Sequence, residues 1–340
     1  MANPNLQELQ NEIKNKTAFL QVLRSEMGRI IAGQEKLIDR LMLALVANGH
    51  VLLEGVPGLA KTLAVKTLSQ SLNGKFSRLQ FTPDLLPADL IGSRIYNAAT
   101  QEFMTRLGSI FANIVLADEI NRAPAKVQSA LLECMQERQI TIAGETHQLP
   151  RPFLVLATQN PIEQEGTYPL PEAQVDRFMF KVLIEYPQRS EELLILERMA
   201  HPEIAPTAQV VATMEDILTA RSCLDQIYLD EKVADYIMDL VIGTRPGHRN
   251  ELSSRQNNVN LSELDGKIEY GVSPRAVINL ALAAKGAALM AGRAYVVPQD
   301  VKDIAPDVLR HRLTLSYEAE AENMDADSII KILLDQLKTP

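Results

Sequence analysis

Glycine, lysine and threonine residues at positions 55–62 have the spacing of a loop that can hold phosphate groups. The run reads Gly-Val-Pro-Gly-Leu-Ala-Lys-Thr and stands between an apolar run at 51–53 and a helix-like stretch at 63–72. In a strand, loop and helix unit, the loop N–H groups and the positive end of the helix face the same anion. Lys61 would reach the β- and γ-phosphate oxygens of a nucleoside triphosphate, and the Thr62 hydroxyl would ligate Mg²⁺.

One position departs from the usual pattern, which has glycine where this chain has Ala60. We expect Gly58 to supply the flexible backbone and Ala60 to adopt right-handed helical geometry, which costs an alanine nothing sterically. A Gly-Pro turn before an amphipathic helix is the alternative interpretation of the run. The nucleotide contacts predicted from this loop are Gly55, Val56, Pro57, Gly58, Leu59, Ala60, Lys61 and Thr62.

Two adjacent carboxylates follow a second apolar run. Residues 114–119 read Ile-Val-Leu-Ala-Asp-Glu, the pattern of a buried parallel strand that ends in acids. In open α/β sheets, ligands bind beyond the carboxyl ends of the strands. We therefore expect Asp118 to hold the hydration shell of Mg²⁺ and Glu119 to orient and polarise the attacking water. Ordinary strand termination is the alternative, and the preceding phosphate loop argues against it.

A third apolar run, at 153–157, leads into Thr158-Gln159-Asn160-Pro161. Asn160 stands where a neutral side chain could hydrogen-bond the γ-phosphate and the attacking water together. By itself, an asparagine before proline is a common turn residue. Its place as the third element in the series favours the functional interpretation.

Together these three segments resemble the Walker A, Walker B and sensor 1 elements of the AAA+ ATPases. Further stretches narrow the resemblance to the MoxR family: Asp-Glu-Ile-Asn-Arg-Ala-Pro at 118–124, Leu-Pro-Glu-Ala-Gln-Val-Asp-Arg-Phe at 170–178 and Gly-Val-Ser-Pro-Arg-Ala at 271–276. Alanine at position 60 is also habitual in that family. The resemblance spans the chain from Gly33 to Arg312.

This resemblance implies an α/β fold, a P-loop AAA+ αβα sandwich with a parallel sheet over residues 1–187, followed by an all-helical lid domain over 188–340. The chain's own pattern agrees, because apolar strands alternate with helical patterns as far as residue 187 and helical periodicity dominates beyond it. Helices are expected at 191–200, 214–220, 231–243, 274–290, 298–312 and 326–337. The segment 245–271, rich in Gly, Asn, Ser and charge, is expected to be a mobile surface loop.

Two arginines take roles from the resemblance. Arg177 matches an arginine finger, which reaches into the neighbouring subunit's site, and Arg275 matches the sensor 2 arginine, which reports the γ-phosphate to the lid. The alternatives are a surface salt bridge of Arg177 with Asp176 or Glu172, and a solvated side chain for Arg275. Arg122 either touches a neighbouring subunit or caps the turn after the acids.

The nucleotide is expected between the two domains, with residues 30–34, including Gly33 and Gln34, against the base and Arg275 closing from the lid. The residues expected to act in catalysis are Lys61, Glu119, Asn160, Arg177 and Arg275. The expected metal contacts come from Thr62 and Asp118.

Two pairs of alternating stretches predict hairpins. One pair lies at 91–97 and 103–108, and the other at 139–143 and 146–149. In ring ATPases such loops project toward the pore or a partner, which makes them candidates for coupling hydrolysis to work. Covering sheet edges is the alternative role.

The family resemblance implies a chaperone-like remodeller that hydrolyses ATP to ADP and phosphate, with Mg²⁺ as cofactor. It would act in the assembly, maturation or metal-cofactor insertion of client protein complexes. Its expected form is a cytoplasmic homo-hexamer, with a von Willebrand factor A domain protein as a separate partner. A nucleic-acid-stimulated or chelatase-like ring motor, an ATP-binding assembly switch and a nucleotide kinase are the alternatives.

Composition bounds these functions. The chain has 340 residues and a net charge of -9, which argues against a strongly basic nucleic-acid surface. It is 46% hydrophobic, yet no apolar run approaches the length of a membrane span. Residues 1–16 lack an apolar targeting core, Cys134 and Cys223 fit reduced thiols, and no histidine pair has zinc-site spacing. A cytoplasmic location is expected, and His50 is expected to be structural.

Overall fold

The computed structural model describes residues 4–56, 58–160, 166–200, 207–257 and 259–340. The chain divides into two compact units. The larger unit comprises Phe19–Phe178 and Val182–Thr219. The smaller unit comprises the chain as far as Ala18, then Met179–Lys181 and Ala220–Pro340.

The larger unit continues past the boundary expected at residue 187. Backbone groups of the continuing segment are bound within it: Gln209 N–H donates to the Glu26 carboxylate at 2.7 Å, and Val211 N–H donates to the Ser71 carbonyl at 2.9 Å. Helix α7 (Arg189–Met199) also lies in the larger unit, although we expected the helix at 191–200 to belong to the lid. Helix α8 (Met214–Ser222) begins there as well.

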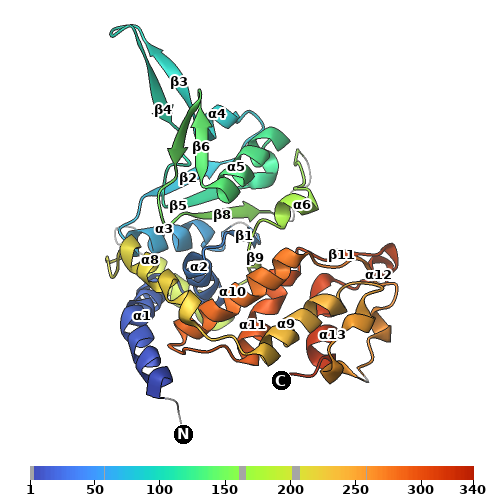
Figure 1. Cartoon of the computed structure of the whole chain (residues 1–340). Coiled ribbons are helices and arrows are strands. Elements are labelled where there is room, and N and C mark those ends of the chain that lie inside the picture. The colour runs from blue at the N-terminus through green and yellow to red at the C-terminus, as the bar shows by residue number, and fades with distance from the viewer. Residues whose placement is uncertain (1–3, 57, 161–165, 201–206, 258) are drawn as a thin grey trace. The chain divides into compact units, whose positions relative to one another are not determined.

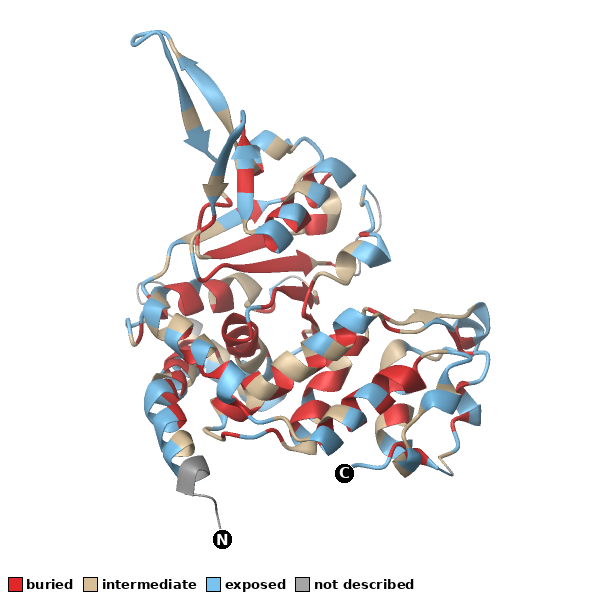
Figure 2. Ribbon diagram, viewed as in Figure 1, coloured by how far each residue is buried: buried red, intermediate tan, exposed pale blue. Residues whose placement is uncertain are grey.

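A five-stranded sheet carries the apolar runs of the sequence. Its order is β2 (Phe76–Gln80), β5 (Ile114–Asp118), β8 (Leu154–Gln159), β1 (Val51–Glu54) and β9 (Phe180–Leu183). The pairs β2–β5, β5–β8 and β8–β1 are parallel. Figure 2 shows β5 and β8 in red, because their apolar residues are buried on both faces of the sheet.

Helices cover both faces of this sheet. Alternate residues of a strand face opposite sides, and Val115 of β5 shares a buried cluster with Leu131 of α5 (Ala125–Glu137). On the other side lie α2 (Glu35–Val46) and α3 (Lys61–Ser71), which bury apolar residues of their own (Figure 1). The predicted αβα sandwich with a parallel sheet is confirmed.

The larger unit also contains its part of α1 (Pro4–Ile30), α4 (Pro87–Ile91), the 3-10 turn η1 (Ile120–Arg122) and α6 (Glu172–Val175). His50, just before β1, is buried and joins two of the layers. Its Nδ1 accepts a hydrogen bond from Val155 N–H at 3.0 Å, and its Nε2 lies 3.1 Å from the Met135 carbonyl oxygen. A proton on Nε2 satisfies both contacts, so His50 has the structural role that we expected.

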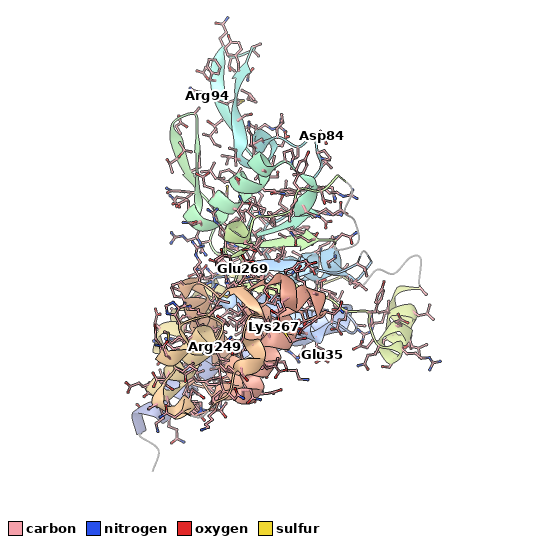
Figure 3. All side chains as sticks on the ribbon, turned by 90° about the vertical axis from the view of Figure 1, so that its right-hand side faces the viewer. Glu35, Asp84, Arg94, Arg249, Lys267 and Glu269 are labelled. Atoms are coloured by element: carbon pink, nitrogen blue, oxygen red, sulfur yellow. The ribbon has the colours of Figure 1, made fainter. Side chains whose placement is uncertain are left out.

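Both predicted hairpins are confirmed. Strand β3 (Gly92–Asn97) pairs antiparallel with β4 (Glu102–Leu107), and β6 (Gln139–Ile142) with β7 (Glu145–Gln148). The β3–β4 hairpin extends away from the sheet (Figure 1). It carries exposed Tyr96 and Phe103 with ring centroids 5.2 Å apart. The guanidinium of Arg94, labelled in Figure 3, lies over the Phe103 ring.

The smaller unit is predominantly helical, as predicted. Its helices are α9 (Glu231–Gly243), α10 (Pro274–Met290), α11 (Pro298–Leu309), α12 (Tyr317–Ala321) and α13 (Ala326–Gln336), with 3-10 turns η2 (Leu224–Gln226), η3 (Arg249–Glu251), η4 (Ser254–Gln256) and η5 (Ser262–Leu264). Asp230, Ser273 and Asp325 begin α9, α10 and α13 by accepting a backbone N–H. An antiparallel pair, β10 (Ile268–Tyr270) and β11 (Thr314–Leu315), adds strand structure that the sequence did not predict.

The segment 245–271 is anchored, in contrast to the mobile loop that its composition predicts. The buried Asp239 carboxylate on α9 accepts hydrogen bonds from Ser253 N–H at 2.8 Å, the Ser253 hydroxyl at 2.7 Å and the Gln256 side-chain amide at 2.9 Å. A buried carboxylate requires such donors. Polar residues of the segment therefore act as hydrogen-bond donors to Asp239, which lies on a helix earlier in the chain.

Two further observations concern the class of protein. Across the described ranges, no helix has both the length and the apolar character needed to cross a membrane. Cys134 and Cys223 are buried thiols. Burial raises the pKa of the Cys134 thiol to about 12, which disfavours the reactive thiolate.

Candidate nucleotide-binding site

The phosphate loop leaves β1 at Glu54 and enters α3 at Lys61. Gly55 is required by packing, since a Cβ atom at this position would lie 2.9 Å from the Ile184 carbonyl oxygen. Pro57 lies outside the described residues. The α3 N-cap has no side-chain hydrogen bond, and the first turn contains no acidic residue. The first N–H groups of α3 therefore remain available to an anionic ligand.

The geometry of Ala60 corrects the sequence prediction. Ala60 is the N-cap of α3 and has φ 55° and ψ 17°, in the left-handed region rather than the right-handed helical region that we expected. Gly58 also has a positive φ, of 88°. The chain must turn sharply between the loop and the helix, and this turn uses left-handed backbone at both positions. At position 60 an alanine pays a steric cost that a glycine avoids.

Lys61, the first residue of α3, is partly buried. Its Nζ donates a hydrogen bond to the Gly55 carbonyl oxygen at 2.6 Å. Burial lowers the pKa of Lys61, and the negative charges of Asp118, Glu119 and Glu54 partly oppose this effect. A nearby phosphate would add negative charge and favour the protonated lysine further.

The two acids follow β5 and are held by β8. Thr158 Oγ1 donates to Asp118 Oδ1 at 2.7 Å and accepts from Glu119 N–H at 2.8 Å. Glu119 has φ 56° and ψ 51°, a left-handed conformation that few non-glycine residues adopt. Such backbone strain clusters at functional sites, where surrounding contacts hold it in place.

Strand β2 contacts the same acids from the opposite side of β5. Arg78 Nη2 and Nε lie 2.7 and 3.1 Å from Asp118 Oδ2, and Gln80 Nε2 donates to Glu119 Oε2 at 2.7 Å. Neither Arg78 nor Gln80 was predicted from the sequence to belong to the site. The one sequence feature that could have indicated them is their i, i+2 spacing, because residues two apart in a strand have side chains on the same face. Arg122, whose role was open, forms an ion pair with Glu119 of its own chain, with Nε 3.3 Å from Oε2.

The phosphate loop, both acids and Arg78 line one cavity of about 420 Å³. Its lining residues are Gly58, Ala60, Lys61, Thr62, Leu63, Arg78, Asp118, Glu119, Thr158 and Asn160. The fold thus brings together seven of the predicted residues from three separate segments: Gly58, Ala60, Lys61, Thr62, Asp118, Glu119 and Asn160. Lysine, hydroxyl, carboxylate and amide groups in one cavity suit a phosphate chain with its cation.

The residues also fit Mg²⁺. This ion prefers hard oxygen ligands and is usually held by one or two carboxylates, substrate phosphates and water. Thr62 and Asp118 supply a hydroxyl and a carboxylate oxygen at the same cavity. In the described ranges, no group of three or more His, Cys, Asp or Glu residues is placed to hold a metal ion by protein ligands alone.

A second cavity of about 280 Å³ adjoins the first and shares Gly58, Ala60 and Leu63 with it. Its other lining residues are Ile30, Ile31, Ala32, Gln34, Leu59, Pro187, Ile195 and Arg198. The largely aliphatic lining suits the flat ring of a nucleotide base. Seven of its lining residues were predicted: Ile30, Ile31, Ala32 and Gln34 against the base, and Gly58, Leu59 and Ala60 in the loop. Gly33, Gly55 and Val56 were also predicted, but they are not among the described residues that line either cavity.

The two predicted arginines lie elsewhere in the fold. Arg177 follows α6 in the larger unit, with partial exposure, and is not among the described residues that line its own chain's phosphate cavity. Arg275 is an exposed residue in the first turn of α10, in the smaller unit, and its N–H donates to Ser273 Oγ at 3.2 Å. Their predicted roles in catalysis remain predictions.

Comparison with known proteins agrees with this geometry. Residues 50–180 match the model of the ATPase family associated with various cellular activities (AAA), and residues 264–333 match the AAA lid domain. A crystal structure of a proposed ATPase from Cytophaga hutchinsonii superposes with a TM-score of 0.88 and 45% identity, covering 98% of each chain. The chain therefore belongs to the AAA ATPase family and has a helical lid domain.

Full-length relatives define the family more closely. The chain is 47% identical over 315 residues to Chaperone MoxR1 of Mycobacterium tuberculosis, covering 93% of this chain and 81% of the relative. It is 43% identical to the uncharacterized protein YeaC of Bacillus subtilis, with 92% of both chains covered. It is 29% identical to protein MoxR of Methylorubrum extorquens, with 93% of both covered. The chain belongs to the MoxR family, as its motifs predicted.

Proposed function

We propose that this chain binds ATP with Mg²⁺ and hydrolyses it to ADP and phosphate. The observation that carries this proposal is the convergence of Lys61, Asp118, Glu119 and Asn160 on one cavity beside the N-terminus of α3. Family membership supports it, because AAA ATPases are built around a nucleotide site.

Each side chain has a distinct task in this proposal. Lys61 neutralises the β- and γ-phosphate oxygens, and Thr62 and Asp118 hold Mg²⁺, which supplies positive charge to the phosphates when bound. Glu119 accepts a proton from the attacking water. Asn160 is a neutral donor that orients the terminal phosphate and the water without adding charge.

The contacts of Glu119 limit how it can act. Gln80 and Arg122 both contact its Oε2 atom. Glu119 therefore accepts the proton through Oε1, or through Oε2 after these contacts break. Either route keeps the carboxylate close to the phosphate cavity that it lines.

We also propose that the active form is a cytoplasmic homo-hexamer that remodels client protein complexes. One relative is named a chaperone, which supports a client protein as partner. In this assembly Arg177 reaches the neighbouring subunit's site, and Arg275 contacts the γ-phosphate from the lid. The work would serve assembly, maturation or metal-cofactor insertion, with a von Willebrand factor A domain protein as a separate partner.

Phosphate release from ATP and ATP binding test the core of this proposal. Glu119→Gln should retain binding and lose turnover by about 10² to 10⁴, the usual contribution of a general base. Lys61→Ala should lose affinity for ATP. Matched controls are Glu137→Gln on α5 and Lys66→Ala on α3, which change exposed side chains.

The controls should hydrolyse ATP like the native chain. A native chain that neither binds ATP with Mg²⁺ nor releases phosphate would contradict the proposal. Native rates in Glu119→Gln would remove Glu119 from the role of base while leaving nucleotide binding intact.

A further inference from the structure

Strand β2 carries a positive charge that contacts the carboxylate expected to bind Mg²⁺. Two nitrogens of the Arg78 guanidinium, Nη2 and Nε, approach the same oxygen, Asp118 Oδ2, at 2.7 and 3.1 Å. Arg78 and Asp118 both line the phosphate cavity. The guanidinium therefore occupies the position beside Asp118 Oδ2 that a nucleotide-bound cation would need in order to use this oxygen as a ligand.

The other oxygen of Asp118 is already engaged. Oδ1 accepts the hydroxyl proton of Thr158 at 2.7 Å, and Thr158 is 2% exposed. Oδ2 has an exposed partner, Arg78, whereas the partner of Oδ1 is buried, so Oδ2 is the oxygen that a cation reaches by displacing the more mobile group. A divalent ion and a guanidinium cannot both lie within contact distance of this oxygen without strong repulsion.

We propose that Arg78 is a positioning residue that competes with the divalent cation for Asp118 Oδ2 and so sets the cation concentration that nucleotide binding requires. The proposal rests on nucleotide binding at this cavity. When a cation binds, the Arg78–Asp118 ion pair opens. When none is bound, Arg78 supplies positive charge to the same cavity.

Exposure makes this exchange feasible. The Arg78 side chain is 50% exposed, whereas that of Asp118 is 15% exposed. A half-exposed arginine can move away at modest cost, because solvent replaces part of the lost interaction. Competition of this strength changes the half-saturating Mg²⁺ concentration by about two- to fivefold rather than abolishing cation binding.

The competition predicts two effects of opposite sign in Arg78→Met. Without Arg78, Asp118 Oδ2 is open to the cation, so the half-saturating Mg²⁺ concentration should fall about two- to fivefold. With the cation removed by chelator, the cavity has lost a positive charge, so nucleotide affinity should fall. A general folding defect would weaken both kinds of binding and cannot produce this pair of changes.

Calorimetric titration of the full chain with ADP tests the proposal without hydrolysis. The titrations are run in chelator and at increasing Mg²⁺, on the native chain, Arg78→Met, Arg78→Lys and the control Arg106→Met. Arg106 is an exposed arginine on β4 and does not line the described phosphate cavity. Arg78→Lys keeps the charge but loses the forked geometry, so its values should lie between those of Arg78→Met and the native chain.

Each outcome decides the matter. An unchanged or higher half-saturating Mg²⁺ concentration in Arg78→Met overturns the competition, provided that thermal unfolding shows the variant folded. If Arg78→Met does not fold, Arg78→Lys takes its place, and unchanged Mg²⁺ dependence in this variant overturns the proposal. Absence of ADP binding by the native chain would instead contradict the nucleotide site itself.

Discussion

Replacing Thr158 by valine removes one buried hydroxyl and leaves the side-chain shape nearly unchanged. That hydroxyl donates to Asp118 Oδ1 at 2.7 Å and accepts from Glu119 N–H at 2.8 Å. Thr158 is 2% exposed, so solvent cannot readily replace both contacts. In Thr158→Val a carboxylate oxygen and a backbone N–H both lose their partner.

The expected loss of stability in Thr158→Val comes from two groups, the Asp118 Oδ1 atom and the Glu119 N–H. A buried polar group left without a partner costs about 1–3 kcal/mol. Asp118 keeps its contact with Arg78 and faces a cavity that water can enter, which favours the lower part of that range. We expect Thr158→Val to lower the free energy of unfolding by about 2–4 kcal/mol.

Turnover should fall as well. The bond from Glu119 N–H to Thr158 helps to hold Glu119 in its left-handed conformation, which costs about 1–3 kcal/mol to maintain. Without this bond the backbone can relax and move the carboxylate. A displacement of about 1 Å at a reacting group can cost about 10²-fold in rate.

Urea unfolding followed by circular dichroism measures the stability change, and phosphate release measures turnover. The control is Thr141→Val, which makes the same substitution at an exposed position of β6. Its hydroxyl contacts only the Thr146 hydroxyl among the described hydrogen bonds, at 3.1 Å. A loss in Thr158→Val below about 0.5 kcal/mol, the scale of an ordinary surface change, would refute the reasoning.

Two further predictions concern the loop and the expected finger. Ala60→Gly should raise the free energy of unfolding by about 0.5–1 kcal/mol. Glycine removes the strain of the left-handed conformation, but its more flexible unfolded state cancels part of this gain. An unchanged or lower urea midpoint would contradict this prediction. Arg177→Ala should bind ATP normally and lose about 10³-fold or more in turnover. Mixing it with Lys61→Ala subunits should restore part of the activity, and no restoration in a mixed ring would count against a shared site.

The buried strands could be predicted because each has a continuous apolar run in its own sequence, which can be recognised without knowing its neighbours in the sheet. Residues of β5 and β8 form continuous apolar runs that end in polar groups, and a strand covered by helices on both faces requires this pattern. The ends of parallel strands meet at one edge of the sheet. Asp118 and Asn160 could therefore be assigned to one site from the order of the segments.

Arg78 and Gln80 could not be assigned in this way. Strand β2 is partly exposed and has no continuous apolar run, so its sequence does not identify it as a neighbour of β5. Only the register, with Gln80 opposite Asp118, shows that its polar side chains reach the acids. Ala60 was missed for a different reason, since its conformation depends on how the loop joins the helix rather than on the preference of alanine.

The two oxygens of Asp118 have partners of contrasting burial. Thr158 contacts Oδ1 from β8 and is 2% exposed, whereas Arg78 contacts Oδ2 from β2 with a side chain that is 50% exposed. Loss of the buried partner leaves groups that water reaches poorly, so the expected effect is on folding stability. Loss of the exposed partner costs little stability because solvent screens the ion pair. Its expected effect is on the cation that competes for the same oxygen.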